Sequence, residues 1–185
     1  MKLLSPTQRR RLNEVAGFLL LSLGLTLLLS FVSYHAQDPS WSTATVARPL
    51  NLIGYPGSYL SDLLLQGFGA AAFLFPFLIF LLAWKWIRSE PVEAGGVKIF
   101  GSALLSLSVS TGLSFLPLPL FGGAVHIGGT LGILLAHYLI ESLNLAGSVV
   151  AIATAGIVSI YLVSSFTVAK LASWFSKHCR PPPCG

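Results

Sequence analysis

The chain has 185 residues, of which 54% are hydrophobic and only 9% are charged, whereas a soluble domain carries nearer a quarter charged residues. This composition excludes a sizeable soluble domain and indicates an all-α integral membrane protein. The net charge of +5 does not indicate a nucleic-acid binder. The cations stand in short clusters at the ends of apolar runs and form no single basic face, so we expect no direct nucleic-acid binding.

A basic cytoplasmic tail over 1–14 is expected to open the chain. It contains three consecutive arginines, Arg9, Arg10 and Arg11. The apolar run over 15–34 is longer than the ~7–15 apolar residues of a cleaved signal peptide, and the bulky Tyr34 stands where cleavage needs a small residue. We therefore expect an uncleaved first span over 15–34.

A periplasmic loop rich in turn-forming residues is expected over 35–62. Asp38-Pro39 favours a turn, which the carboxylate of Asp38 is expected to cap. Ser40 and Trp41 follow, so a large aromatic ring stands directly behind this turn. Trp41 is either an anchor at the membrane interface or a contact residue that docks the loop on the bundle or on a partner. The expected form is an irregular segment on the outer membrane surface.

The second span is expected over 63–87, because no charged residue occurs between Leu63 and Trp84. As a helix this stretch would be about 33 Å long, enough to cross a hydrocarbon core ~30 Å thick. Lys85 and Arg88 close the span beside tryptophans, which is typical of a cytoplasmic boundary. Pro76 falls mid-span, where neighbouring helices are expected to satisfy the carbonyl that it leaves free.

A hydrophilic cytoplasmic link over 88–98 leads to a third span over 99–116. Serine recurs at every fourth position of this span, so the four side chains share one helical face: Ser102, Ser106, Ser110 and Ser114. A stripe of small polar residues predicts a helix-packing seam. The alternative is the lining of a water path.

The segment over 117–144 is rich in glycine and proline and is expected on the periplasmic side. It contains a short apolar stretch over 130–140, too short to cross a bilayer and therefore re-entrant or interfacial. His137 and Glu141 are four residues apart and share a face. They are either a partly solvated interfacial pair or a proton relay.

The last span is expected over 145–169. It carries a second small-residue seam with four-residue spacing, made by Gly147, Ala151, Ala155 and Ser159. Such a seam predicts packing on the third span or on another subunit. The cytoplasmic tail over 170–185 ends in a stiff triple proline, typical of the start of a linker. Its Cys179 and Cys184, with His178, are too few ligands for structural zinc, so no metal is expected.

The distribution of cations predicts the orientation. Four spans place both termini and the 88–98 link on the same side, and only Arg48 of the eleven Lys and Arg residues falls on the other side. The positive-inside rule then places both termini in the cytoplasm. The cations that carry this prediction are Arg9, Arg10, Arg11, Lys85, Arg88, Lys98, Lys170, Lys177 and Arg180. A five-span alternative would export the C-terminal cations and bury Glu141 at a cost of ~3 kcal/mol.

No catalytic motif is present. The sequence lacks a Walker A pattern, an H-E-x-x-H pair and a dinucleotide fingerprint. We therefore expect no enzyme activity, catalytic residue or cofactor in this chain.

Several motifs in order do resemble a known family. They are the arginine-rich tail, Asp38-Pro39-Ser40-Trp41 after the first span, Asn51-x-x-Gly54-x-x-Gly57, Asp62, Gly67-x-Gly69 and Gly128-Gly129-x-x-Gly132. Together they resemble the N-terminal four-span membrane domain of the FtsK/SpoIIIE DNA translocases, over residues 9–170. The Asp-Pro-Ser-Trp sequence is the most specific of these motifs.

The resemblance implies a bacterial inner-membrane protein of cell division and chromosome segregation. It implies a four-helix bundle that anchors the protein at the septum, contacts other division proteins, self-associates and tethers a cytosolic ATPase. The residues after Ala169 are too few to hold that motor, so ATP hydrolysis and DNA pumping are not expected here. The alternative is a small channel or transporter, built from the serine stripe, the broken segment over 122–132 and the pair His137/Glu141.

Overall fold

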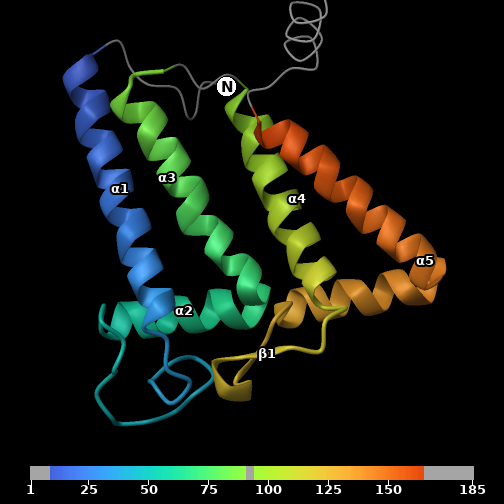
Figure 1. The fold of residues 1–185 in the computed structure, drawn as a ribbon. Helices are drawn as coiled ribbons and strands as arrows, with labels where there is room; N and C mark the ends of the chain where they lie inside the picture. The colour runs from blue at the N-terminus through green and yellow to red at the C-terminus, as the bar shows by residue number, and fades with distance from the viewer. Residues whose placement is uncertain (1–8, 91–93, 165–185) are drawn as a thin grey trace, which may run out of the picture.

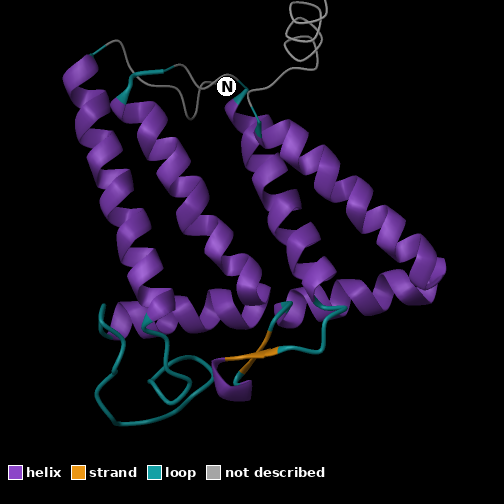
Figure 2. Cartoon of the chain, viewed as in Figure 1, coloured by secondary structure: helices purple, strands orange, loops and turns teal. Residues whose placement is uncertain are grey.

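The computed structural model describes residues 9–90 and 94–164, and over these residues the chain is predominantly helical (Figure 2). The elements in chain order are α1 (Arg10–Val32), α2 (Tyr55–Phe68), the 3-10 helix η1 (Gly69–Phe73), α3 (Leu74–Ile87), α4 (Gly95–Leu113), β1 (Pro119–Leu120), the 3-10 helix η2 (Phe121–Gly123), β2 (Val125–His126) and α5 (Gly129–Val163). The two short strands pair antiparallel, with Pro119 opposite His126.

Four helical segments are long and apolar enough to cross a membrane: Arg10–Val32, Tyr55–Ile87, Gly95–Leu113 and Gly129–Val163. This confirms the expected all-α membrane fold with four spans. The first helix begins at Arg10, before the expected start at residue 15, and the third runs over Gly95–Leu113 where 99–116 was expected.

The four spans form two antiparallel hairpins, α1 with α3 and α4 with α5 (Figure 1). Glycines allow the close approach within each hairpin. A Cβ atom on Gly17 of α1 would lie 2.6 Å from Cγ1 of Ile87, and one on Gly101 of α4 would lie 2.8 Å from Cβ of Leu162. Any larger residue at these positions would push the paired helices apart.

The second span is bent, which the sequence analysis did not predict. Helix α2 lies across one side of the bundle, the chain turns at Gly69 (φ 60°), and α3 then crosses toward the opposite side (Figure 1). The loop expected over 35–62 is therefore shorter than predicted, and the second span, expected over 63–87, begins earlier and is divided at Gly69. The loop ends at Gly54, and α2 takes up both the end of the expected loop and the start of the expected span.

Pro76 has a different environment from the one expected. It lies in the first turn of α3, three residues after the N-cap residue Phe73. Proline is tolerated in a first turn, where backbone N–H groups lack the partners of a helix interior. No carbonyl in mid-span has to be satisfied by a neighbouring helix.

Helix α5 is bent as well, at Asn144 (φ 60°, ψ 170°). This combination of φ and ψ lies outside the left-handed helical region and is almost confined to glycine, so asparagine adopts it at a cost on the order of 1–3 kcal/mol. The part before the bend lies across the same side of the bundle as α2, and the part after it returns along α4 (Figure 1). This confirms the expected short helix ahead of the last span. Of that span, 145–164 is described and 165–169 is not.

We call the side that carries α2, the strands and residues 33–54 the loop side, and the opposite side the basic side. The basic side holds the start of α1, the end of α3 and the start of α4 (Figure 1). These helix ends carry six cations, Arg9, Arg10, Arg11, Lys85, Arg88 and Lys98. Arg48 is the one described Lys or Arg residue on the loop side; Lys170, Lys177 and Arg180 lie outside the described residues.

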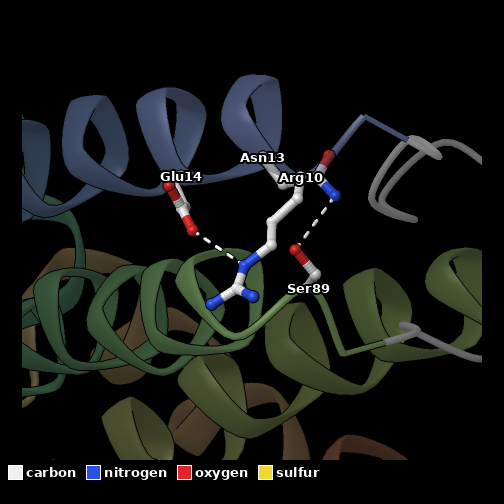
Figure 3. Close-up of polar contacts among 4 residues, drawn as sticks. All are labelled: Arg10, Asn13, Glu14 and Ser89. Atoms are coloured by element: carbon white, nitrogen blue, oxygen red, sulfur yellow. Dashed lines mark hydrogen bonds and ion pairs between the residues drawn. The ribbon is translucent and has the colours of Figure 1, made fainter.

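On the basic side, a polar contact joins α1 to the end of α3. Asn13 is only 1% exposed, and its side-chain amide donates to Oγ of Ser89 at 3.2 Å. Figure 3 shows this pair beside the ion pair of Arg10 with Glu14, whose atoms are 3.0 Å apart. The buried amide fixes the register of α1 against α3.

The two hairpins are joined by close backbone contact at three glycines, which we call the glycine junction: Gly67, Gly69 and Gly129. The backbone N–H of Ala70 donates to the carbonyl of Ile127 at 2.8 Å. A Cβ atom on Gly69 would overlap the Ile127 carbonyl oxygen, and one on Gly129 would overlap the backbone nitrogen of Gly69. The junction therefore admits no side chain on Gly69 or Gly129.

This contact can be tested with Gly69→Ala and a matched control, Gly122→Ala. Both glycines have positive φ, 60° and 68°, but nothing lies within 4 Å of a Cβ atom on Gly122. Gly122→Ala should lower the free energy of unfolding in detergent only by the cost of a left-handed alanine, about 1–2 kcal/mol. Gly69→Ala should lower it by about 1–3 kcal/mol more, because of the overlap and because ψ at Gly69 is −138°, where alanine is less tolerated than at ψ 21° of Gly122. Equal losses in the two variants would contradict the close contact.

Candidate interaction site on the loop side

The loop between α1 and α2 is organised by a buried carboxylate. Asp38 is 5% exposed, and its two oxygens accept hydrogen bonds from the backbone N–H groups of Leu50, at 2.8 Å, and Asn51, at 2.9 Å. The prediction that Asp38 caps its own turn was therefore wrong. Asp38 closes the loop on itself through residues 12 and 13 positions further along, with charge-assisted bonds that are stronger than neutral ones.

Asn51 ties this loop to the end of α1. It is 4% exposed, its side-chain amide donates to the carbonyl of Ser30 at 2.8 Å, and its oxygen accepts from the N–H of Ile53 at 3.0 Å. Ser30 in turn donates through its hydroxyl to the carbonyl of Gly57 in α2, at 2.6 Å. A side chain on Gly57 would overlap the Asn51 oxygen, so this contact also depends on a glycine.

A second buried carboxylate, Asp62 on α2, is 5% exposed. It accepts hydrogen bonds from the phenol of Tyr34 at 2.9 Å and from the hydroxyl of Ser42 at 2.5 Å. Burial, together with the bond to Asp62, raises the pKa of Tyr34 from 10.0 to about 12. The phenol therefore stays a neutral donor to the carboxylate above the pH at which an ordinary tyrosine loses its proton.

The four residues of the predicted motif have different roles in this geometry. Asp38 and Pro39 are buried, and the carbonyl of Pro39 accepts a hydrogen bond from the hydroxyl of Ser58 on α2 at 2.8 Å. Ser40 accepts from the N–H of Thr43 at 3.1 Å. The ring of Trp41 meets Tyr59 edge-on at 5.8 Å but stays 72% exposed. Three residues build the loop and the fourth is presented on it.

Trp41 is one of a set of large apolar side chains exposed on the loop and at the start of α2. The set comprises Trp41, Val46, Leu50, Leu52 and Tyr55, and we call it the exposed apolar set. Large apolar side chains held out on a rigid frame are typical of an interaction site. The polar interior of the loop and this apolar exterior together form the candidate site.

The arrangement offers nothing that would bind a metal ion. Within 9–90 and 94–164, no three His, Cys, Asp or Glu side chains lie close enough together to hold one. His137 and Glu141 are both exposed on the part of α5 before the bend. Cys179, Cys184 and His178 lie outside the described residues.

The serine stripe of α4 faces the start of α5. Ser110 donates to the carbonyl of Gly128 at 2.5 Å, and a side chain on Gly132 would overlap Ser110. The hydroxyls of the other three serines donate to backbone carbonyls one turn earlier in α4. These donors are Ser102, Ser106 and Ser114. All four hydroxyls are thus engaged by backbone oxygens of the protein.

The second predicted seam lies on the less exposed face of α5 after its bend. Ser159 is fully buried, and the other three seam residues are partly buried: Gly147, Ala151 and Ala155. Neighbouring α5 residues Ile152 and Leu162 lie against Gly112 and Gly101 of α4. This face of α5 is therefore turned toward α4 within the same chain.

Sequence reasoning missed part of the polar framework. Ser30 was not singled out, and Asn51 and Asp62 entered only through the family resemblance. A signal was present in Asp62, a lone acid directly ahead of a long uncharged run. The signal at Ser30 was weaker, because small polar residues are common in membrane helices and Ser30 lies in the apolar run of the first span.

Asp38→Ala tests the loop framework. The change leaves the buried backbone N–H of Asn51 without an acceptor and should lower the free energy of unfolding by about 1–3 kcal/mol. Asp38→Asn keeps one acceptor oxygen and should lower the free energy of unfolding by less. The exposed neighbour Gln37 supplies the control, since Gln37→Ala should leave stability unchanged. Chemical unfolding in detergent would measure the stability of each variant, and protease cleavage within 42–50 would measure how firmly the loop is held. Cleavage of Asp38→Ala at the wild-type rate would contradict the role of Asp38 in closing the loop.

The pKa of Tyr34 gives a pH dependence. Because the folded-state pKa, about 12, lies above the ordinary value of 10.0, the associated stability is present below pH 10.0 and is lost as pH rises through about 12. A titration followed by tyrosinate absorbance should show one late step that Tyr34→Phe removes. Tyr55→Phe, at an exposed tyrosine, should leave that step in place. A late step that survives in Tyr34→Phe would rule out this assignment.

Comparison with known proteins agrees with this geometry. The family model for the 4TM region of DNA translocase FtsK/SpoIIIE matches residues 9–176. A DNA translocase FtsK of Rickettsia typhi is 35% identical over 135 residues, which are 71% of this chain and 17% of that protein. DNA translocase FtsK 2 of Ralstonia nicotianae is 31% identical over 181 residues, 88% of this chain and 22% of that protein.

The chain thus spans about a fifth of the length of these relatives. No solved structure matches it. The match covers the loop, both bends and the glycine junction that hold the bundle together. The chain therefore belongs to the family of four-span membrane regions of the FtsK/SpoIIIE DNA translocases.

Proposed function

We propose that this chain is the membrane-anchoring and assembly module of an FtsK-like DNA translocase of cell division and chromosome segregation. It holds that translocase at the division septum of the inner membrane, with both termini in the cytoplasm. The observation that carries the proposal is the match to the 4TM region of FtsK/SpoIIIE over residues 9–176, on a chain with four membrane-spanning segments.

The segregation of charge supports the proposed orientation. The described cations gather on the basic side, with Arg48 as the exception on the loop side. Under the positive-inside rule the basic side faces the cytoplasm. The exposed apolar set then faces the periplasm, where other division proteins reach it, and a cytosolic motor would be joined on the basic side.

Catalysis has no part in this role. The relatives match the chain over their membrane region alone, and the buried carboxylates Asp38 and Asp62 are used as hydrogen-bond acceptors inside the loop framework. Their function is to hold the loop in one shape. Affinity for a partner would come from the exposed apolar set, with Trp41 as its centre.

Self-association also belongs to this proposal. The small-residue face of α5 at Gly147, Ala151, Ala155 and Ser159 is turned toward α4 of the same chain. Contacts between subunits would therefore use the outward helix faces, among them the exposed Phe77 and Leu81 of α3. The channel alternative has less support, because Ser106 and Ser110 of the serine stripe are buried within the chain.

Septal placement can be tested with a fluorescent fusion of the chain in a bacterial host whose own copy has been removed. We expect a band at midcell that coincides with the division ring. An even distribution around the envelope, at normal abundance, would contradict the anchor role.

Trp41→Ala separates a partner contact from a structural role. Because Trp41 is 72% exposed and its ring meets Tyr59 edge-on, its loss should cost no more than about 0.5–1.5 kcal/mol of stability. We expect abundance to be unchanged while recovery of division proteins in a cross-linking pull-down falls severalfold. Arg48→Gln, on the same loop, is the control; equal recovery in both variants would exclude Trp41 as a contact residue.

A further inference from the structure

Two charged side chains are exposed on the loop side. Within 9–90 and 94–164, the Lys, Arg, Asp and Glu residues of this side are Asp38, Arg48, Asp62 and Glu141, and the two aspartates are buried. Arg48 and Glu141 are both exposed. Neither forms a hydrogen bond or an ion pair with another described residue. The loop side therefore presents one positive and one negative group to a partner outside the chain.

The two charges lie at opposite ends of the molecule. Arg48 belongs to residues 33–54, which lie below the α1/α3 hairpin in Figure 1. Glu141 lies just before the bend of α5 at Asn144, and this bend is at the end of the molecule farthest from α1 (Figure 1). Both charges are on the same side of the bundle. One copy of the chain cannot bring them together, but two neighbouring copies can.

Membrane insertion restricts how two copies meet. Copies inserted in the same orientation are related by rotation about the membrane normal. A twofold contact joins the same surface patch of both copies, so it would place Arg48 near Arg48 or Glu141 near Glu141, where like charges repel. A head-to-tail contact places Arg48 of one copy beside Glu141 of the next. Charge complementarity therefore favours the head-to-tail contact.

Exposed apolar side chains accompany Arg48. Val46 and Leu50 stand on either side of it in sequence, and both are exposed, Leu50 at 67%. Helix α1 has 23 residues, so it is about 34 Å long and by itself spans a hydrocarbon core of ~30 Å. The loop follows the end of this helix and lies beyond it (Figure 1). Lipid chains therefore do not cover these side chains, whereas the surface of a neighbouring protein would.

The bend of α5 also lacks a cover within the chain. Residues 141–146 are all exposed, among them Leu143 at 49% and Leu145 at 58%. Asn144, at the bend, has a backbone conformation that is almost confined to glycine. Such strain persists where the surroundings fix the conformation. A second copy packed on the bend would supply contacts that the described residues of the chain do not.

We propose that copies of this chain associate head to tail on the loop side, with Arg48 of one copy paired to Glu141 at the α5 bend of the next. Each pair of copies leaves one loop and one bend free, so the contact continues to further copies and closes into a ring where the rotation permits. Trp41 is not used and remains available to other proteins. This deepens the proposed self-association and rests on it.

Disulfide cross-linking tests the contact without changing either charge. Ala47 and Ser142 are exposed and adjoin the two charged residues. Ala47→Cys and Ser142→Cys are placed in two full chains with different tags, both also carrying Cys179→Ser and Cys184→Ser, and the chains are co-expressed. Oxidation of isolated membranes should join the two tags. Equally fast cross-linking between two Ala47→Cys chains, or between two Ser142→Cys chains, would overturn the head-to-tail arrangement.

Charge reversal tests the pair itself, with recovery of one tagged copy by another as the measure. Arg48→Glu alone or Glu141→Arg alone should lower recovery about fivefold, because a repulsion replaces an attraction. Co-expression of the two variants should restore recovery, since every loop again meets a bend of opposite charge. The double variant in one chain should also associate as the wild type does. Arg88→Glu reverses an exposed cation of the basic side and is the matched control, with recovery unchanged.

The outcomes separate this contact from self-association in general. Recovery that neither the mixture nor the double variant restores, at normal abundance of each chain, would overturn the pairing of Arg48 with Glu141. Association of the wild type without the cross-link between the two tags would overturn this contact alone. Absence of any association would overturn self-association as well. Because the cysteine variants keep both charges, their result stands even if a reversal variant fails to fold.

Discussion

The bundle depends on the close approach of two stretches of backbone at the glycine junction. Each hairpin is held by its own helix packing, but α1 with α3 and α4 with α5 would be separate bodies without a contact between them. The closest part of that contact is the hydrogen bond from Ala70 to Ile127, made possible because neither Gly69 nor Gly129 carries a side chain. A second bond, from Thr130 to the carbonyl of Gln66 at 3.0 Å, lies beside it. Side-chain packing joins the same two halves, through Tyr34 against Phe121 and through the core cluster that holds Leu65 and Val125. Backbone groups in an apolar surrounding must be paired. The hydrogen bonds at the junction therefore join the two hairpins and also satisfy backbone groups that would otherwise lack partners.

The loop side combines a polar interior with an apolar exterior, the reverse of the usual order in a soluble domain. Asp38, Asn51 and Asp62 are buried and fully engaged, whereas Trp41 and Leu52 are exposed. Buried polar networks specify one arrangement when every member is satisfied. The loop can therefore present apolar side chains in a fixed geometry without collapsing around them. The apolar core beneath it, with Phe31 and Leu65 both at 0% exposure, links α1 to α2.

Much of this fold follows from sequence patterns alone. Four apolar runs and one-sided cations predicted the spans, and serines at every fourth position marked a face of α4 that now meets Gly128. The bends escaped prediction for a physical reason. The uncharged apolar run continues across the bend, from Leu63 to Trp84, so hydropathy does not mark it. The turn at Gly69 is fixed by Ile127, which lies 58 positions further along the chain. The role of Asp38 was mispredicted for the same reason. The sequence around a turn does not reveal that its carboxylate accepts hydrogen bonds from the distant N–H groups of Leu50 and Asn51.

The two bends give the molecule unequal cross-sections. Helix α2 and the first part of α5 lie flat on the loop side, while only helix ends reach the basic side (Figure 1). With these two helices at the depth of one leaflet, the chain would displace more lipid from that leaflet than from the other. A flat bilayer would then be under elastic stress, and the energy of the inserted protein would fall where the membrane bends toward the narrower side.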